Sequence, residues 1–283
     1  MSAVMADRRA TAARASADGL RRSATSFLTP LLSAHDLTVG IAGATFCRDL
    51  QLDVQPGDCL AILGRNGAGK STLLSVLAGL RPPLAGKVRL NGADYHQLGA
   101  RASARLRGWL PQTRNDAFAA TVIETALIGR HPHLGRWEWE SVKDAEIARQ
   151  ALAAVGLTEL AMRDVQTLSG GERQRLAIAT LLCQDPHLLL LDEPLAHLDL
   201  NHQIAILELL ATRSREQRVA CVVVLHEPGL AARFCTRALL LFGDGESQQG
   251  SCDELITSEA LSRLYGYPLK EVGDGPNRWF MPV

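Results

Sequence analysis

The sequence has no excess of charge of either sign. Its 283 residues include 30 lysines and arginines and 30 aspartates and glutamates, so the formal net charge is +0 at pH 7. Tight binding along DNA or RNA rests on clustered basic side chains that neutralise phosphates. We therefore expect no nucleic-acid partner, although the total leaves room for a local basic patch.

Closely spaced cysteine pairs are also missing. The six cysteines stand at positions 47, 59, 183, 221, 235 and 252. No two of them have the Cys-x-x-Cys spacing of a zinc knuckle or a thioredoxin-like redox site. Cys59 and Cys221 lie in apolar runs, where a thiol is usually a small core residue. This usage fits the reducing cytosol.

Long apolar runs are absent as well. The longest, such as 188–191 and 219–225, are much shorter than the roughly 18 residues that a membrane helix needs. We therefore expect the chain to meet a membrane only through a partner.

The first 29 residues differ from the rest in composition. They are rich in alanine, arginine and serine, and their only acids are Asp7 and Asp18. They lack the apolar centre of a secretory signal peptide. A transit peptide, a disordered tail and an overcalled start codon all fit this composition. We favour a tail without a targeting role, with structure beginning near Leu31.

Beyond the tail, strand-like and helix-like segments alternate, which is typical of an α/β fold. The expected strands are 31–39, 50–54, 58–63, 87–90, 188–191, 219–225 and 238–242. The expected helices include 69–79, 141–155 and 172–182. From about 121 to 168 the strand signal disappears, which predicts a mainly helical insert in an α/β core.

These patterns divide the chain into three parts. We expect a tail at 1–29, one domain over 31–270 with a helical subdomain inserted at about 113–185, and a C-terminal tail at 271–283. The last part contains Gly273, Gly275 and Pro276, so it should begin as a loop. Trp279 and Phe280 should pack it back onto the core.

A glycine-rich segment carries the strongest chemical signal. Residues 64–71 match the pattern G-x-x-x-x-G-K-[ST] between a predicted strand and a predicted helix, as in a P-loop. The loop's backbone N–H groups and the helix N-terminus then point at one anion. A chance glycine loop is the alternative, and this context counts against it. We expect a nucleoside triphosphate to be bound by Gly64, Arg65, Asn66, Gly67, Ala68, Gly69, Lys70, Ser71 and Thr72.

Two carboxylates follow a fully apolar segment. Asp192 and Glu193 come directly after 188–191, and a buried parallel strand would deliver them beside the P-loop. Asp192 suits a water-mediated Mg²⁺ ligand, alongside the hydroxyl of Ser71. Glu193 could take a proton from an attacking water. Carboxylates after strands are common, so the assignment of Asp192 and Glu193 to the nucleotide site depends on the P-loop.

A second turn suited to an anion opens another helix. Ser169, Gly170 and Gly171 precede the helix expected at 172–182. One nucleotide does not need two such cradles in one chain. We therefore expect a head-to-tail homodimer in which each Ser169 turn serves the partner's nucleotide.

Taken in order, these motifs resemble the ATPase subunits of ABC transporters over about residues 31–270. The resemblance implies ATP and Mg²⁺ as ligands. It also implies a RecA-like P-loop core with an antiparallel β subdomain and a helical subdomain that carries the signature. The matching motifs are the Walker A motif at 64–71, the Q-loop Gln112, the signature at 168–174, the Walker B motif at 188–192 with Glu193, the D-loop at 196–199 and the switch histidine His226.

The resemblance also implies roles and partners. Gln112 would contact Mg²⁺ and link the nucleotide to a transmembrane permease. His226 would contact the γ-phosphate, where a satisfied buried histidine is the ordinary alternative. Asp199 would pass conformational changes between the two sites. The assembly would lie on the cytoplasmic face of the inner membrane, with a substrate-binding protein as an indirect partner.

Three positions depart from the family pattern. Ile41 stands where an aromatic ring usually stacks on adenine, and Phe46 is a candidate substitute. Glu227-Pro228 replaces the common Asp-Leu after His226, and Leu195 replaces a common threonine. None removes a reacting group, so we expect an active ATPase.

Two stretches, 128–137 and 196–203, are similar to ATPases of importers for iron chelates, haem and cobalamin. His131 and His133 lack a third ligand at coherent spacing, so we expect them to shape a partner-facing surface rather than bind metal. Trp137 and Trp139 fit either core anchors or exposed contacts. A soluble ABC ATPase and a separately encoded exporter remain as alternative functions.

Overall fold

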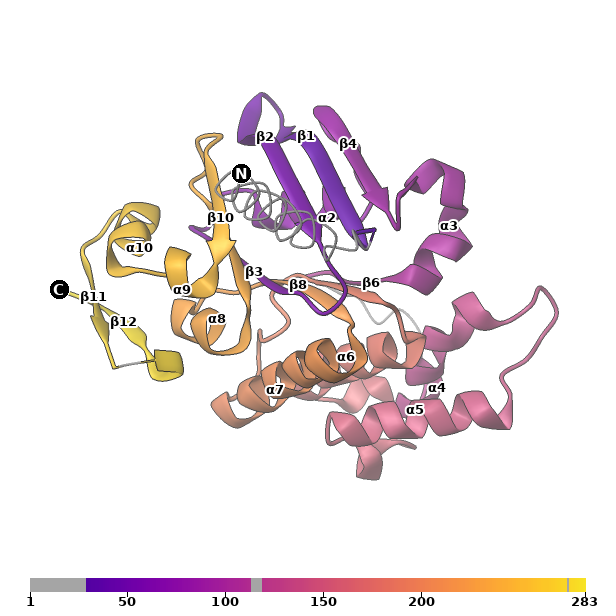
Figure 1. The fold of residues 1–283 in the computed structure, drawn as a ribbon. Coiled ribbons are helices and arrows are strands. Elements are labelled where there is room, and N and C mark those ends of the chain that lie inside the picture. The colour runs from indigo at the N-terminus through magenta and orange to yellow at the C-terminus, as the bar shows by residue number, and fades with distance from the viewer. Residues whose placement is uncertain (1–28, 113–118, 274) are drawn as a thin grey trace, which may run out of the picture.

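The computed structural model describes residues 29–112, 119–273 and 275–283. Two sheets and the helices around them form stacked layers (Figure 1). Nearly all of the expected N-terminal tail, residues 1–28, lies outside the described residues. Within the described part of the chain, no helix combines the length and apolar character needed to cross a membrane.

The larger sheet has six strands, and five of them run parallel. Its spatial order is β10 (Ser247–Ser251), β9 (Arg237–Leu241), β3 (Cys59–Gly64), β8 (Ala220–Val224), β7 (Leu188–Leu191) and β6 (Arg107–Leu110). Every residue of β3, β7 and β8 is buried, as expected for central strands covered on both faces. The predicted α/β class is therefore confirmed, and β6 and β10 are added to the expected strands.

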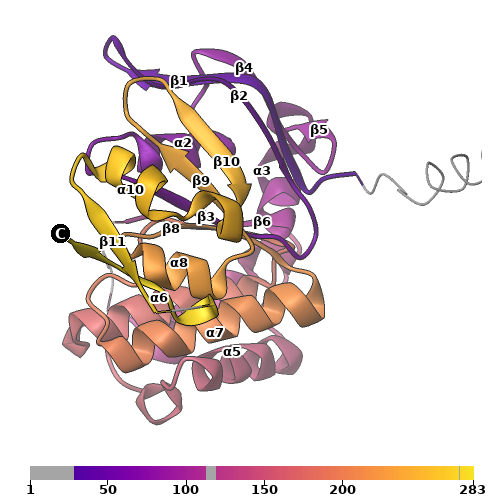
Figure 2. The same cartoon turned by 60° about the vertical axis from the view of Figure 1, so that its left-hand side comes forward.

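The smaller sheet is antiparallel and has four strands. Its order is β2 (Ala44–Val54), β1 (Leu32–Ile41), β4 (Ala85–Leu90) and β5 (Ala93–Asp94). It arches over helix α2 (Lys70–Leu77), which lies between the two sheets (Figure 2). Apolar side chains of both sheets and of α2 share one buried cluster, which includes Leu37, Leu73 and Ile62. The antiparallel β subdomain is thus packed onto the P-loop core.

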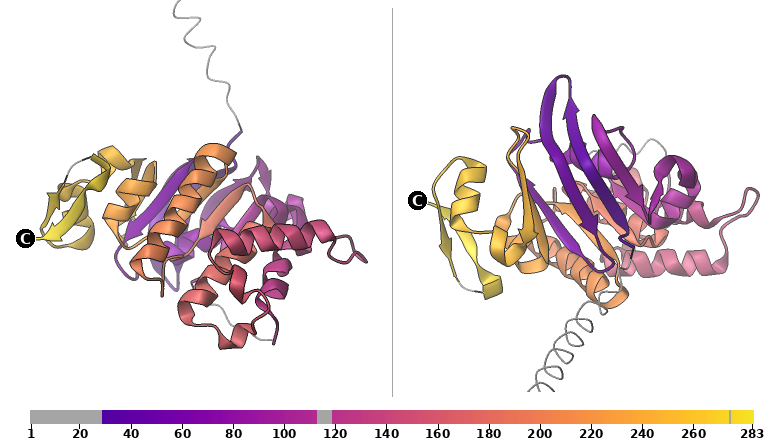
Figure 3. Two further views of the ribbon diagram at one scale, coloured as in Figure 1. Left: turned by 90° about the horizontal axis from the view of Figure 1, so that it is seen from below. Right: turned by 45° about the horizontal axis from the view of Figure 1, so that its top comes forward.

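Helices cover the other face of the larger sheet (Figure 3). They are α6 (Gly170–Gln184), α7 (Leu200–Gln217), α8 (Pro228–Phe234), α9 (Cys252–Leu255) and α10 (Ser258–Tyr265). Their buried side chains join those of alternate sheet residues such as Cys59, Ala61 and Leu63 in a second cluster. The period of two along β3 explains the split, because Leu60 and Ile62 face the first cluster.

The middle of the chain is helical, as predicted. Helix α3 (Tyr95–Leu106) precedes it, and the insert itself contains α4 (Val122–Leu127), η1 (Ile128–His133), α5 (Val142–Ala154), η2 (Thr158–Leu160) and η3 (Val165–Thr167). A largely buried ion pair stabilises it, since Arg130 Nε lies 2.8 Å from Asp144 Oδ1. Hydrogen bonds from Ser141 and Arg130 lower the pKa of Asp144 to about 2, so this carboxylate is charged at neutral pH.

The expected C-terminal loop begins two residues later than predicted. Glu271 and Val272 belong to β11 (Leu269–Val272), which pairs with β12 (Trp279–Pro282), and the turn between them holds η4 (Gly275–Asn277). The pairing across the turn overrides the poor strand propensity of two charged residues. Phe280 packs against the core, and Trp279 contacts Gly229 on α8. The predicted docking of this end is confirmed.

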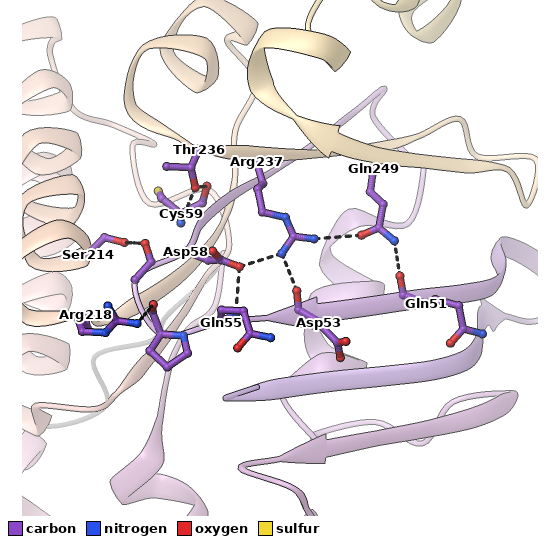
Figure 4. A network of polar contacts seen from close by, with 12 residues as sticks. Gln51, Asp53, Gln55, Asp58, Cys59, Ser214, Arg218, Thr236, Arg237 and Gln249 are labelled. Atoms are coloured by element: carbon purple, nitrogen blue, oxygen red, sulfur yellow. Dashed lines mark hydrogen bonds and ion pairs between the residues drawn. The ribbon is translucent and has the colours of Figure 1, made fainter. Parts of the chain in front are cut away.

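A polar network joins the two sheets at the end opposite the P-loop (Figure 4). Arg237 donates to Asp58 at 2.8 Å and also to the carbonyl of Asp53 in β2. Asp58 in turn accepts from the backbone N–H of Gln55 at 2.9 Å. These charge-assisted bonds fix the turn between β2 and β3, and so the start of the strand that carries the P-loop.

Candidate functional site

Four parallel strands bring the predicted residues to one edge of the sheet. β3 ends at Gly64, β6 leads to Gln112, β7 leads to Asp192, and β8 leads to His226. Because the carboxyl ends of parallel strands meet at the same edge, these segments converge there. The convergence predicted from the sequence is present.

The glycine-rich loop has the backbone of an anion cradle. Gly67 and Gly69 adopt φ of 82° and 87°, a region open to glycine at no steric cost. Lys70 Nζ donates to the carbonyls of Gly64 and Arg65 at 2.8 and 3.0 Å. The lysine is only 6% exposed. Burial lowers its pKa, while Glu193 and Asp192 oppose the shift.

Ser71 and Asp192 form a hydrogen-bonded pair beside the cradle. Ser71 Oγ donates to Asp192 Oδ1 at 3.0 Å. Asp192 is only 3% exposed, and burial raises its pKa. Hard oxygen ligands of this kind suit Mg²⁺. The donor set thus fits a magnesium ion next to the glycine-rich loop.

Glu193 is the centre of a second contact group. Its Oε2 accepts from Gln112 Nε2 at 3.1 Å, and its Oε1 lies 2.9 Å from His226 Nε2. The residue adopts a left-handed φ of 50°, which is strained for a non-glycine residue. Local strain of this kind concentrates at functional sites. The structure therefore brings together all three residues predicted to be catalytic.

A cavity of about 290 Å³ opens over the cradle. Its lining, among the described residues, is Phe46, Asn66, Gly67, Gly69, Lys70, Ser71, Thr72, Gln112 and Glu193. Phe46 is the only aromatic residue in this set. Ile41, where the family pattern has a ring, is absent from it.

The Ser169 turn lies elsewhere in the same chain. Ser169 caps α6, its Oγ accepting from the backbone N–H of Glu172 at 3.3 Å while Glu172 accepts from its N–H at 2.7 Å. Ser169, Gly170 and Gly171 are not among the described residues that line the cradle cavity. Because Oγ serves as the cap acceptor, its proton remains able to donate to an anion.

Two contacts near this turn were not predicted. Gly170 and Gly171 lie against His197 of the D-loop. Gln174 Nε2 donates to the carbonyl of Pro194 at 2.9 Å, which ties α6 to the residue after Glu193. The sequence places Gln174 in the signature but does not say which turn it meets.

Asp199 holds the start of α7. It accepts from the backbone N–H of His202 at 3.0 Å and lies 2.7 Å from that imidazole. These bonds lower the pKa of Asp199, the backbone N–H first. The D-loop therefore ends in a fixed helix cap, and the Asp199 side chain is exposed.

The insert presents apolar side chains to solvent. Trp137 and Trp139 are 86% and 88% exposed, so the interpretation as core anchors is wrong and their expected exposure is confirmed, while a contact with a partner stays a prediction. A hollow of about 570 Å³ lies between α3 and the segment after η1, lined in part by Arg101, Ala104 and Pro132. Arg101 Nε donates to the Pro132 carbonyl at 3.0 Å. His133 is tied to the Gln184 carbonyl at 2.8 Å.

The chain is similar in sequence to ATP-binding proteins of ABC transporters. A family model described as ABC transporter matches residues 47–196. The chain is 41% identical over 264 residues to the hemin import ATP-binding protein HmuV of Burkholderia pseudomallei, covering 87% of this chain and 97% of that protein. It is 38% identical over 238 residues to the ferric enterobactin transport ATP-binding protein FepC of Escherichia coli, covering 83% and 87%.

Solved structures agree with the observed fold. A chain of a structure described as an inward-facing metal-chelate type ABC transporter matches with a TM-score of 0.77 and 31% identity, covering 89% of this chain and 97% of that one. A dimeric ATP-binding cassette bound to ADP and phosphate matches with a TM-score of 0.70 and 26% identity, covering 78% and 98%.

Proposed function

We propose, from the premise that this chain belongs to the ABC transporter family and is an ATPase, that it drives the import of haem or a ferric siderophore. The single observation that carries the cargo class is the 41% identity to a hemin import ATP-binding protein over 97% of that protein. Two further similarities, to a ferric enterobactin ATPase and to a metal-chelate type transporter, support the same class. Cobalamin, a third cargo suggested by the sequence, has less support.

In the proposed mechanism the cradle binds the triphosphate of ATP. The backbone N–H groups after Gly64 and the N-terminus of α2 face the phosphates, and Lys70 exchanges its carbonyl partners for phosphate oxygens. Ser71, Asp192 and Gln112 would hold Mg²⁺, which when bound neutralises charge on the β- and γ-phosphates. Thr72 would contact the α-phosphate.

Glu193 is the proposed general base. Its carboxylate is held between Gln112 and His226, so it is oriented from both sides. It would take a proton from the attacking water, and His226 would contact the γ-phosphate. His226 Nε2 lies 2.9 Å from Glu193 Oε1, and nucleotide binding would redirect His226 toward the γ-phosphate.

Two copies would complete each site. Ser169 and Gly171 lie outside the cradle cavity of their own chain, which supports a partner as the recipient of their donors. Two solved structures of a similar cassette are described as dimeric, which supports the pairing of two copies. Closure onto ATP would then drive the mechanical step, and hydrolysis would reset it. Asp199, at the start of α7, would link the two sites.

The permease would dock on the insert side of the cytoplasmic subunit. Several large apolar residues of the insert are exposed, namely Ile128, Trp137, Trp139, Val142 and Met162. Aromatic residues such as tryptophan are enriched in protein–protein interfaces. The hollow lined by α3, η1 and the segment after η1 lies between α3 and this insert, and it offers a concave surface for a helix. Gln112 would transmit the movement, since it contacts Glu193 directly.

The test is cargo uptake in the native host. A chromosomal Lys70→Ala substitution should abolish uptake of iron-labelled haemin or of a labelled ferric siderophore, because the pump loses its energy source. Lys270→Ala, an exposed lysine on β11, serves as the matched control and should import normally. Loss of cobalamin uptake alone would overturn the cargo class. Unchanged uptake of all three would favour a separately encoded exporter or a soluble ABC ATPase.

A further inference from the structure

The glycine-rich loop can bind the phosphates of a nucleotide, but the base must be bound by other residues. Ile41, in the position where the family pattern has a ring, is poorly placed to provide one. It pairs with Ala44 at the tip of the β1–β2 hairpin, is 41% exposed, and does not line the cradle cavity. The tip itself is a tight turn through Ala42 and Gly43, both at positive φ.

Phe46, two residues further into β2 from Ala44, lies at the cradle. Its ring rests directly on the backbone of Gly69, so that any side chain at position 69 would overlap the ring. Gly69 is the cap of α2, immediately before Lys70. The ring is therefore supported by the P-loop backbone and also borders the cavity.

The backbone that carries Phe46 is held on both sides. Thr45 and Cys47 pair with Gly40 and Val39 in β1. On the other side the N–H of Arg48 donates to the carbonyl of Gly245 at 2.9 Å, between β9 and β10. Cys47 is fully buried. A ring on such a strand loses little freedom when it meets a ligand, which favours binding.

We propose that Phe46 is the aromatic platform on which the base of the nucleotide packs, in place of a ring at position 41. A base is joined to its α-phosphate through one ribose, so it must lie just outside the cradle. Phe46 adjoins that edge and is the sole aromatic residue among the described residues of the cavity lining. The inference rests on triphosphate binding at the P-loop and adds how the rest of the nucleotide is recognised.

A stacking contact has a definite consequence for selectivity. Every base has a π-face, so a ring that reads the face tolerates different bases. We therefore expect loss of the Phe46 ring to weaken ATP and GTP by the same factor. Inorganic tripolyphosphate, which has no base, should be unaffected.

The experiment measures equilibrium binding to the full chain by calorimetry with Mg²⁺ and three ligands, ATP, GTP and inorganic tripolyphosphate. Phe46→Leu keeps an apolar side chain and removes the ring, while Phe46→Tyr keeps the ring. Ile41→Ala is the matched control on the same hairpin. We expect Phe46→Leu to weaken ATP and GTP about tenfold, as for other base–aromatic contacts. Phe46→Tyr and Ile41→Ala should bind like the unchanged protein.

Several results would contradict the proposed role of Phe46 or the triphosphate binding on which it rests. Unchanged ATP binding in Phe46→Leu, or a loss confined to Ile41→Ala, would overturn the platform. An equal loss for ATP and tripolyphosphate would also overturn it, since the ring would then merely support the cradle. If the unchanged protein bound neither ATP nor tripolyphosphate, the proposal of triphosphate binding at the P-loop would itself be disproved.

Discussion

Replacing Glu193 by glutamine should stop hydrolysis while leaving ATP bound. The amide has the shape of the carboxylate and can still accept from Gln112, yet it cannot take a proton from water. General-base catalysis contributes about 100- to 10,000-fold, so turnover should fall by at least about 100-fold. Because the closed state is no longer reset, an ATP-dependent dimer should accumulate. Steady-state ATPase assays and size-exclusion chromatography with light scattering measure the two effects.

The control for this substitution is Glu208→Gln on the exposed side of α7, which removes a carboxylate away from the site. It should hydrolyse ATP at the unchanged rate. A Glu193→Gln protein that stays monomeric with ATP, while the unchanged protein dimerises, would count against Glu193 as the base. So would retained turnover.

Replacing Lys70 by alanine should weaken triphosphate binding and abolish turnover. The ammonium group is buried and is held by the carbonyls of Gly64 and Arg65, so it is already aimed at the cradle. Hydrogen bonds to charged groups are worth about 1.5–3 kcal/mol, which corresponds to a roughly 10- to 100-fold weaker Kd for ATP. Calorimetric titration with Mg·ATP measures the loss.

ATP-dependent dimerisation distinguishes the Lys70 and Glu193 substitutions. Lys70→Ala should fail to dimerise with ATP, whereas Glu193→Gln should dimerise more. Thermal unfolding without nucleotide checks that Lys70→Ala has not simply lost its fold. Normal turnover in a folded Lys70→Ala protein would show that the P-loop is not where the triphosphate binds.

The parts of the fold that could be predicted are those with local signals. The four leucines of β7 and the strand–glycine–helix order of the P-loop each lie in one short stretch. Helix α7 is not among the expected helices, although Ile206, Leu207 and Leu210 stand at helical spacing and are buried, so the sequence does carry a signal for it. β10 has no such signal, because its polar residues become a strand only by pairing with β9 at the edge of the sheet.

The same distinction holds at the site. Motifs placed Lys70, Asp192, Glu193 and His226, since each follows a strand of one parallel sheet. The ring of Phe46 on Gly69 and the bond from Gln174 to Pro194 join segments that the sequence does not relate. Both contacts depend on how the layers of the fold pack together.

Helix α3 is broken at Gly99, with φ of 75°. This break interrupts the helical pattern, so the sequence does not predict the helix.

Cross-linking tests whether two chains complete each ATP site. All six native cysteines are buried, so a thiol introduced on the surface is the reactive one. One Glu193→Gln chain carries Asn66→Cys in the cradle, and another carries Ser169→Cys in the signature turn. A short bifunctional maleimide should join the two chains only when they are mixed with ATP, and neither chain should cross-link to itself. Absence of a covalent dimer with ATP, or one that forms equally without ATP, would contradict the two-chain site.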